Sequence, residues 1–160
     1  MAPLAKRGKH QGWWVVGLAS WGGAGFLPYA PGTWGSLAAL PLWWGLAQTG
    51  PWGYGAGFAV LLAAALMVSG PAQEQLGRLD HPAIVIDEVA GLLVTLAGVA
   101  PQWFPVAAGW FLFRVFDILK PWPIRWLSAG SGGLDVVVDD LAAGVMARLL
   151  LEVVLALTGT

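Results

Sequence analysis

The chain of 160 residues contains no cysteine. It can therefore form no disulfide bond, no thiolate metal site and no cysteine nucleophile, although this absence does not identify a compartment. The only histidines are His10 and His81, which are too few and too poorly placed for a phosphohistidine mechanism. A DxDxT-like aspartyl nucleophile signature is also missing. Several common routes for covalent catalysis are thereby excluded.

Charged residues are scarce. They make up 11% of the chain, against about 25% in a typical soluble domain, while hydrophobic residues make up 58%. Residues 10–73 and 89–113 carry no formal charge at all. This composition, with a mean hydropathy of +0.70, predicts a membrane protein. The net charge of -1 provides no basic face, so we do not expect nucleic acid as a partner.

The length allows a single domain, which we place at residues 17–160 after a basic tail at residues 1–16. The tail carries Lys6, Arg7 and Lys9, and the tendency of basic residues to stay inside predicts that it lies in the cytosol. An even number of passages through the membrane would bring the other polar segments to the same side. The sequence leaves the oligomeric state open.

The apolar segments predict helices. We expect one helix at residues 33–49 with Thr33 as N-cap, which Pro41 could kink. A tight turn at Gly50 to Gly53 and a second helix at residues 54–70 should follow. Residues 89–113 are too few for two full crossings, which predicts a shallow or re-entrant pair with its turn at residues 101–105.

The remaining signals predict two further helix boundaries. One helix should end at Lys120, because prolines follow it, and SAGSGG should form a flexible connection. A last helix should begin near Asp139 or Asp140 and run to about residue 157. We therefore expect an all-α, compact, membrane-embedded helical bundle with short or re-entrant hairpins and an acidic cytosolic face.

Carboxylates concentrate in the segments that this arrangement brings to one face. The five residues are Asp87, Glu88, Asp117, Asp139 and Asp140. Such a concentration of negative charge is difficult to maintain without a cation. Mg²⁺ prefers oxygen ligands and takes only one or two carboxylates, leaving positions for water and phosphate. The pattern predicts a Mg²⁺ site.

Two cations flank one of these carboxylates. Arg114 and Lys120 each lie three residues from Asp117, on neighbouring faces of one helix. Arginine can bind phosphate with its planar fork and lysine adds a point charge, so the set suits a phosphomonoester substrate. The helix start at Gly32 and Thr33 could bind another phosphate oxygen.

Structural roles are alternatives for the same residues. Arg114 and Asp117 could form an internal salt bridge, and Asp139, Asp140 or Thr33 could simply cap helices. Arg148 and Glu152 share a helical stripe with Asp140 that should face the interior, and we expect them to form an ion pair or support the site.

Four motifs carry a resemblance to a known family: APGTWGSL, IVIDEVAG, FRVFDILKPWPI and VVDDLAAG. In this order, over residues 17–155, they resemble the phosphatidylglycerophosphatase A family of membrane phosphatases. The resemblance implies a compact all-helical fold, dependence on Mg²⁺, a bacterial inner-membrane location and a phospholipid substrate. By motif position it also implies a functional set, namely Thr33, Asp87, Glu88, Arg114, Asp117, Lys120, Asp139 and Asp140.

Taken together, these features predict a Mg²⁺-dependent lipid phosphatase that converts phosphatidylglycerophosphate to phosphatidylglycerol and inorganic phosphate. The expected catalytic residues are Asp87, Arg114, Asp117 and Lys120; the expected metal ligands are Glu88, Asp117, Asp139 and Asp140; the phosphate contacts are Thr33, Arg114 and Lys120. Attack by water is the simplest chemistry, and a covalent aspartyl intermediate stays open. A small transporter or channel, or a non-catalytic assembly protein, is the alternative.

Overall fold

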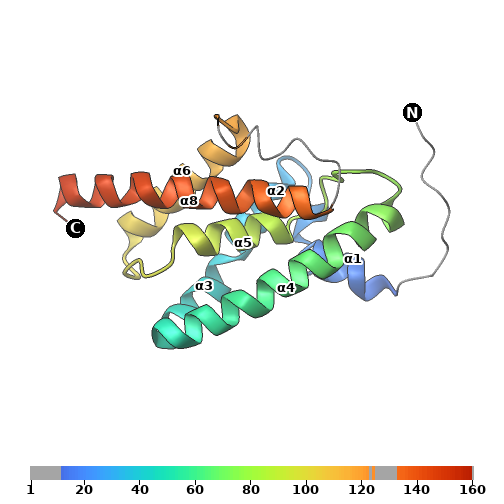
Figure 1. Ribbon diagram of the computed structural model, residues 1–160, viewed down its shortest axis with the longest axis horizontal. Helices are drawn as coiled ribbons and strands as arrows, with labels where there is room; N and C mark the ends of the chain where they lie inside the picture. The colour runs from blue at the N-terminus through green and yellow to red at the C-terminus, as the bar shows by residue number, and fades with distance from the viewer. Residues whose placement is uncertain (1–11, 123, 125–132, 160) are drawn as a thin grey trace.

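A computed structural model describes residues 12–122, 124 and 133–159 (Figure 1). Over these residues the secondary structure is helical, without strands, which confirms the all-α class. The elements are α1 (Trp13–Ala19), the 3₁₀ turn η1 (Ala24–Phe26), α2 (Pro31–Ala38), α3 (Leu40–Ala47), α4 (Gly50–Leu76), α5 (Ile86–Thr95), α6 (Trp103–Leu119) and α8 (Gly133–Thr158). Residues 1–11 of the basic tail and most of the SAGSGG connection lie outside the described residues.

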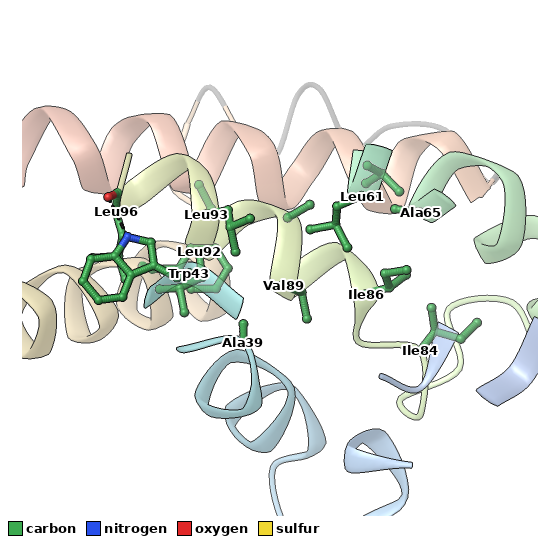
Figure 2. Close-up of a cluster of buried hydrophobic side chains, with 14 of the residues drawn as sticks. Ala39, Trp43, Leu61, Ala65, Ile84, Ile86, Val89, Leu92, Leu93 and Leu96 are labelled. Carbon is green, nitrogen blue, oxygen red and sulfur yellow. Dashed lines mark hydrogen bonds between the residues drawn. The ribbon is translucent and has the colours of Figure 1, made fainter. Parts of the chain in front are cut away.

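Helix α5 is the centre of the molecule. Its residues Ile86, Val89, Leu92 and Leu93 are fully buried, although the helix has only ten residues. Helices α2, α4, α6 and α8 all contact it, and Figure 2 shows its side chains within the buried cluster. Because α5 is surrounded, the polar groups of its first turn are brought into the interior.

The carboxyl end of α5 is held by side chains from neighbouring helices. The Trp43 indole donates a hydrogen bond of 2.9 Å to the Leu96 carbonyl, and the Tyr54 hydroxyl donates one of 2.6 Å to the Leu93 carbonyl (Figure 2 shows Trp43 beside Leu96). The last carbonyls of a helix lack partners within it, so these bonds satisfy groups that would otherwise be costly to bury. They fix the position of α5 along its axis.

Glycines bring α5 and α8 into close contact. A Cβ atom at Gly91 would lie 2.5 Å from the Asp140 carbonyl oxygen, and one at Gly144 would clash with the Gly91 carbonyl. At the same crossing, the Thr95 hydroxyl donates a hydrogen bond of 3.2 Å to the Gly144 carbonyl. Small residues allow helix backbones to approach in this way. In Figure 1, α5 and α8 run side by side, with their first turns at the same end.

The expected helix at residues 33–49 is instead two helices, α2 and α3, which meet at Ala39. Pro41 lies in the first turn of α3, where its missing N–H is tolerated, whereas inside one continuous helix its ring would clash with the preceding turn. The N-cap of α2 is Ala30, so the expectation that Thr33 is the N-cap was wrong. Thr33 lies within the first turn.

The tight turn expected at Gly50 to Gly53 is also absent from the described structure, because α4 begins at Gly50 and runs for 27 residues to Leu76. Pro51 is in the first turn of α4, a position that favours helix initiation. Pro105 likewise lies in the first turn of α6 rather than in the connection, so the turn expected at residues 101–105 ends earlier. In each case proline starts a helix where we expected it to interrupt one.

Helix α6 ends before Lys120, as expected, and Lys120 adopts a left-handed conformation with φ of 40°. Helix α8 begins at Gly133, several residues earlier than predicted. Asp139 and Asp140 therefore lie inside the helix and are not its caps, which corrects the simplest structural interpretation of both residues. The two residues are 5% and 4% exposed.

Two helices are long and apolar enough to cross a membrane. They are α4, with 27 residues, and residues Asp135–Thr158 of α8, with 24 residues. Only 28% and 22% of their most apolar windows are buried within the structure, so most of this hydrophobic surface faces outward. In Figure 1 the carboxyl end of α4 and the start of α8 lie at the same end of the molecule. These features support association with a membrane.

Candidate active site

Three carboxylates from two helices meet at the α5–α8 crossing. Asp87 and Glu88 lie in the first turn of α5, and Asp140 lies one turn before Gly144 on α8. One oxygen from each carboxylate falls within 4.8 Å of the others, a separation that would allow a shared cation. Asp87 is only 2% exposed, and its Oδ1 accepts a 3.1 Å hydrogen bond from the Glu88 backbone N–H.

The surroundings of this cluster oppose its negative charge. Burial raises the pKa of Asp87, with the nearby charge of Asp117 adding to the effect. Burial also raises the pKa of Glu88 well above its usual range, as do the charges of Asp87, Asp140 and Asp117. Glu88 Oε2 is buried and has no hydrogen-bond partner among the described residues. These carboxylate oxygens fit a divalent cation, whose positive charge would offset the repulsion among them.

The two cations lie beside the cluster, each paired with an aspartate. Arg114 forms an ion pair of 2.5 Å with Asp117, and both side chains are 12% exposed. Lys120 Nζ lies 2.9 Å from Asp139 Oδ2. The internal salt bridge considered from the sequence is thus present, and it holds the guanidinium in place next to Glu88.

Burial lowers the pKa of Lys120, but the hydrogen bond that its ammonium donates to Asp139 and the charges of Asp140, Asp139 and Asp117 outweigh that effect and raise the pKa overall. The lysine therefore stays positively charged. Because Lys120 is about one-third exposed, with a side-chain exposure of 37%, its ammonium is accessible to an anion from outside. The Arg114 side chain is less accessible.

The first turn of α2 closes the site on another side. A Cβ atom at Gly32 would clash with Glu88 Oε1 and lie 3.0 Å from an Arg114 terminal nitrogen. Any larger residue here would have to displace the Glu88 carboxylate or the Arg114 guanidinium. Thr33, the next residue, is half-buried, and its carbonyl accepts a 3.0 Å hydrogen bond from the Ser36 hydroxyl. The start of α2 thus borders both a carboxylate and a cation.

Comparison with known proteins identifies the family. The family model described as phosphatidylglycerophosphatase A matches residues 17–155, which include every residue of the site. The chain belongs to the phosphatidylglycerophosphatase A family. The motifs that suggested the resemblance are the segments that converge here.

Individual relatives agree with this assignment. Phosphatidylglycerophosphatase A of Escherichia coli is 39% identical over 127 residues, covering 78% of this chain and 73% of the relative. The Haemophilus influenzae protein of the same name is 34% identical, covering 78% of each chain. A Bacteroides thetaiotaomicron relative with the provisional name phosphatidylinositol-3-phosphatase is 34% identical, covering 82% of this chain and 87% of the relative. No solved structure matches significantly.

The five carboxylates expected in the site differ in their partners. Asp87, Glu88 and Asp140 form the cluster, whereas Asp117 pairs with Arg114 and Asp139 pairs with Lys120. Asp117 also lies within hydrogen-bonding reach of Asp140, so it borders the cluster. Sequence reasoning did not assign roles to Gly91 and Gly144, which set the distance between the two helices. Each glycine follows an acidic residue of the cluster by four positions and therefore lies on the same helix face. This spacing is the sequence signal that could have identified the two glycines.

Arg148 and Glu152 form an ion pair, as expected. Glu152, however, is 56% exposed at its side chain, so the stripe does not face the interior along its whole length. The pair lies two to three helical turns beyond Asp140, outside the carboxylate cluster. Its geometry supports a structural role.

Proposed function

We propose that this protein is a membrane phosphatase that hydrolyses phosphatidylglycerophosphate to phosphatidylglycerol and inorganic phosphate. The observation that carries the proposal is the convergence of the family's motifs: carboxylates, cations and a helix start from four segments meet at one buried site. Phosphoryl transfer is catalysed largely by positioning and by neutralising charge, and this set of side chains suits both tasks.

We infer that Mg²⁺ binds at the cluster of Asp87, Glu88 and Asp140, through two of its three carboxylates. The support is the close set of carboxylate oxygens and the buried Glu88 Oε2 without a hydrogen-bond partner among the described residues. When bound, the ion would polarise a phosphoryl oxygen and favour ionisation of a water molecule. Mg²⁺ needs only one or two of the carboxylates, so we assign Glu88 and Asp140 to the metal and leave Asp87 as the general base.

The cations bind the phosphate of the substrate in this proposal. Arg114, oriented by Asp117, faces the same space as Gly32 and Glu88, and Lys120 is held by Asp139. The first turn of α2 adds the positive end of a helix dipole, and the Thr33 hydroxyl is a candidate donor to a phosphate oxygen. Asp117 and Asp139 thereby become positioning residues rather than metal ligands.

We further infer that the site faces the cytosol at the inner membrane of a bacterium. The relatives are bacterial proteins, and the start of α8 and the end of α4, where the charged residues gather, lie at one end of the molecule. The lipid would then present its headgroup at this end, with its hydrocarbon beside the apolar helices.

The test is phosphate release by purified protein in detergent micelles. Phosphatidylglycerophosphate should be hydrolysed with Mg²⁺ and not with chelator. Glu88→Gln should be inactive, whereas Glu74→Gln, which changes an exposed glutamate of α4 outside the site, should keep wild-type turnover. Failure of the wild-type protein to release phosphate from this lipid under any divalent-ion condition would refute the proposal.

The Bacteroides relative supports a second candidate substrate of the same bond type, phosphatidylinositol 3-phosphate. An assay of the two lipids at equal mole fraction in the micelle decides between them. We expect a higher kcat/KM for phosphatidylglycerophosphate, and the reverse order would reassign the headgroup while keeping the phosphatase chemistry.

A further inference from the structure

An apolar groove of about 340 Å³ lies between α3 and the first half of α6. None of its lining residues has a role in the proposed hydrolysis of the phosphate ester. Its walls include the indoles of Trp43, Trp103 and Trp110, together with Leu37 and Val106. The volume is at the lower end of the range for small-molecule pockets, about 300–1,000 Å³. Gln102 is its one polar lining residue, so a charged ligand would gain little there.

The groove ends one helical turn from the candidate active site. The Trp110 indole donates a 3.0 Å hydrogen bond to the Ser36 hydroxyl, which joins α6 to α2 at the end of the groove. One helical turn further along each helix are Arg114 and Gly32, which border the carboxylate cluster. At 1.5 Å of rise per residue, Trp110 lies about 6 Å and Trp103 about 16 Å from Arg114 along the axis of α6.

This arrangement matches the layout of an amphiphile. One end of the α2–α6 seam carries a cation and carboxylates, and the other end carries aromatic and aliphatic side chains. Trp103 is 82% exposed, so the apolar end opens outward rather than into the protein core. A molecule with a phosphate at one end and hydrocarbon at the other would satisfy both ends at once.

We propose that the groove binds an acyl chain of the substrate lipid and thereby directs its phosphomonoester to Arg114. This inference rests on the proposed lipid phosphatase function and deepens it. An acyl chain of an ordinary membrane lipid could also lie in the groove, but its headgroup would make no contact with Arg114. Binding of a substrate chain, in contrast, should make the enzyme selective for substrates with long acyl chains.

The variant that tests the groove is Ala107→Phe. Ala107 is an exposed lining residue of α6, so the added ring occupies the groove without entering the core. Ala63→Phe is the matched control, because it adds the same ring to an exposed position of α4 that does not line the groove. Both are assayed against two lipid phosphomonoesters with the same headgroup, one with short and one with long acyl chains.

We expect wild-type protein and Ala63→Phe to prefer the long-chain lipid by about tenfold or more in kcat/KM, and Ala107→Phe to lose most of this preference. Rates on the short-chain lipid should be similar in all three proteins, which also shows that the variants are folded. Equal preference in Ala107→Phe and Ala63→Phe would overturn the proposal, as would a wild-type enzyme with no chain-length preference.

A measurement independent of turnover separates failure of the groove from failure of the proposed function. A lipid phosphomonoester with a photoreactive diazirine in its acyl chain is crosslinked to wild-type protein in micelles, and the labelled peptides are mapped. Label concentrated at residues 103–110 and reduced by Ala107→Phe supports the groove. Label spread evenly over the apolar surface of α4 and α8 contradicts it, whether or not phosphate is released.

Discussion

At the scale of single residues, Glu88 is the side chain on which the site depends most. It contacts the backbone at Gly32, belongs to the carboxylate cluster, and has a buried oxygen without a hydrogen-bond partner among the described residues. Burial and three neighbouring carboxylates raise its pKa, so the ionised form destabilises the folded protein. A residue that costs stability in this way is expected to serve a function.

Glu88→Gln should therefore be more stable than wild type when a chelator removes divalent ions. Relief of about 1 kcal/mol of repulsion would raise Tm by roughly 2–4 °C in a protein of this size. Mg²⁺ should raise the Tm of wild type but not that of Glu88→Gln. Thermal unfolding in detergent, with Glu74→Gln as control, measures both effects. A lower Tm for Glu88→Gln in chelator would show that the carboxylate contributes to the fold instead.

Arg114 distinguishes a functional ion pair from a purely structural one. If it binds the phosphate in the transition state, Arg114→Ala should reduce kcat/KM by about 10²–10³, the loss typical for removing one such donor. Asp117→Asn should also reduce kcat/KM, because the guanidinium loses the negative charge that orients it, while the protein stays folded. Steady-state kinetics check both variants. A normal kcat/KM for Arg114→Ala would support the salt bridge alone.

At the scale of elements, the α5–α8 crossing places the cluster, and glycine sets its distance. Gly144→Ala should destabilise the protein by about 1–3 kcal/mol, because its Cβ would meet the Gly91 backbone, which cannot move aside as a side chain can. Gly55→Ala in α4 has open space and should be neutral or slightly stabilising. Chemical denaturation compares the two, and equal stability would argue against close packing at this crossing.

The sequence predicted helices correctly but placed several of their ends wrongly. Pro41, Pro51 and Pro105 each fall in the first turn of a helix, where proline is compatible with the helical backbone. Proline is found both where a helix is interrupted and where a helix begins, so the sequence alone does not distinguish the two. The start of α8 was displaced because acidic residues favour helix N-termini, yet here Asp139 and Asp140 face the site from within the helix.

The grouping of the site was predictable only in part. Motif positions pointed to all of the acidic and basic residues, because isolated charges in an apolar chain are conspicuous. Which carboxylates meet each other depends on a crossing angle and on a close backbone approach, and neither follows from spacing along one chain. Asp117 was expected among the metal ligands; the structure pairs it with Arg114 beside the cluster, and its role as a ligand stays a prediction.

At the scale of the whole molecule, two helices are long and apolar enough to cross a membrane, and the carboxyl end of α4 lies at the same end of the molecule as the start of α8. If α4 spans the bilayer, its ends must be accessible from opposite sides. Because the chain has no cysteine, single cysteines can be introduced without a background. Leu79→Cys and Trp52→Cys are suitable, since Leu79 is 48% and Trp52 is 92% exposed near the two ends of α4.

We expect an impermeant maleimide to label Leu79→Cys from the cytosolic side and Trp52→Cys from the other side, measured in inside-out and right-side-out membrane vesicles. The backbone carbonyls and N–H groups of a spanning helix form hydrogen bonds within the helix, so α4 can cross the membrane without backbone hydrogen bonds to another segment. Labelling of both cysteines from one side would mean that α4 does not cross the membrane.

The most direct test of the account is the Mg²⁺ dependence of phosphate release from phosphatidylglycerophosphate by wild type and Asp140→Asn. If the carboxylates at the α5–α8 crossing hold the ion, Asp140→Asn should abolish release or raise the Mg²⁺ concentration for half-maximal activity by about tenfold or more. Release by Asp140→Asn at the wild-type rate with the wild-type Mg²⁺ requirement, or wild-type release in excess chelator, would contradict a metal site formed by these residues.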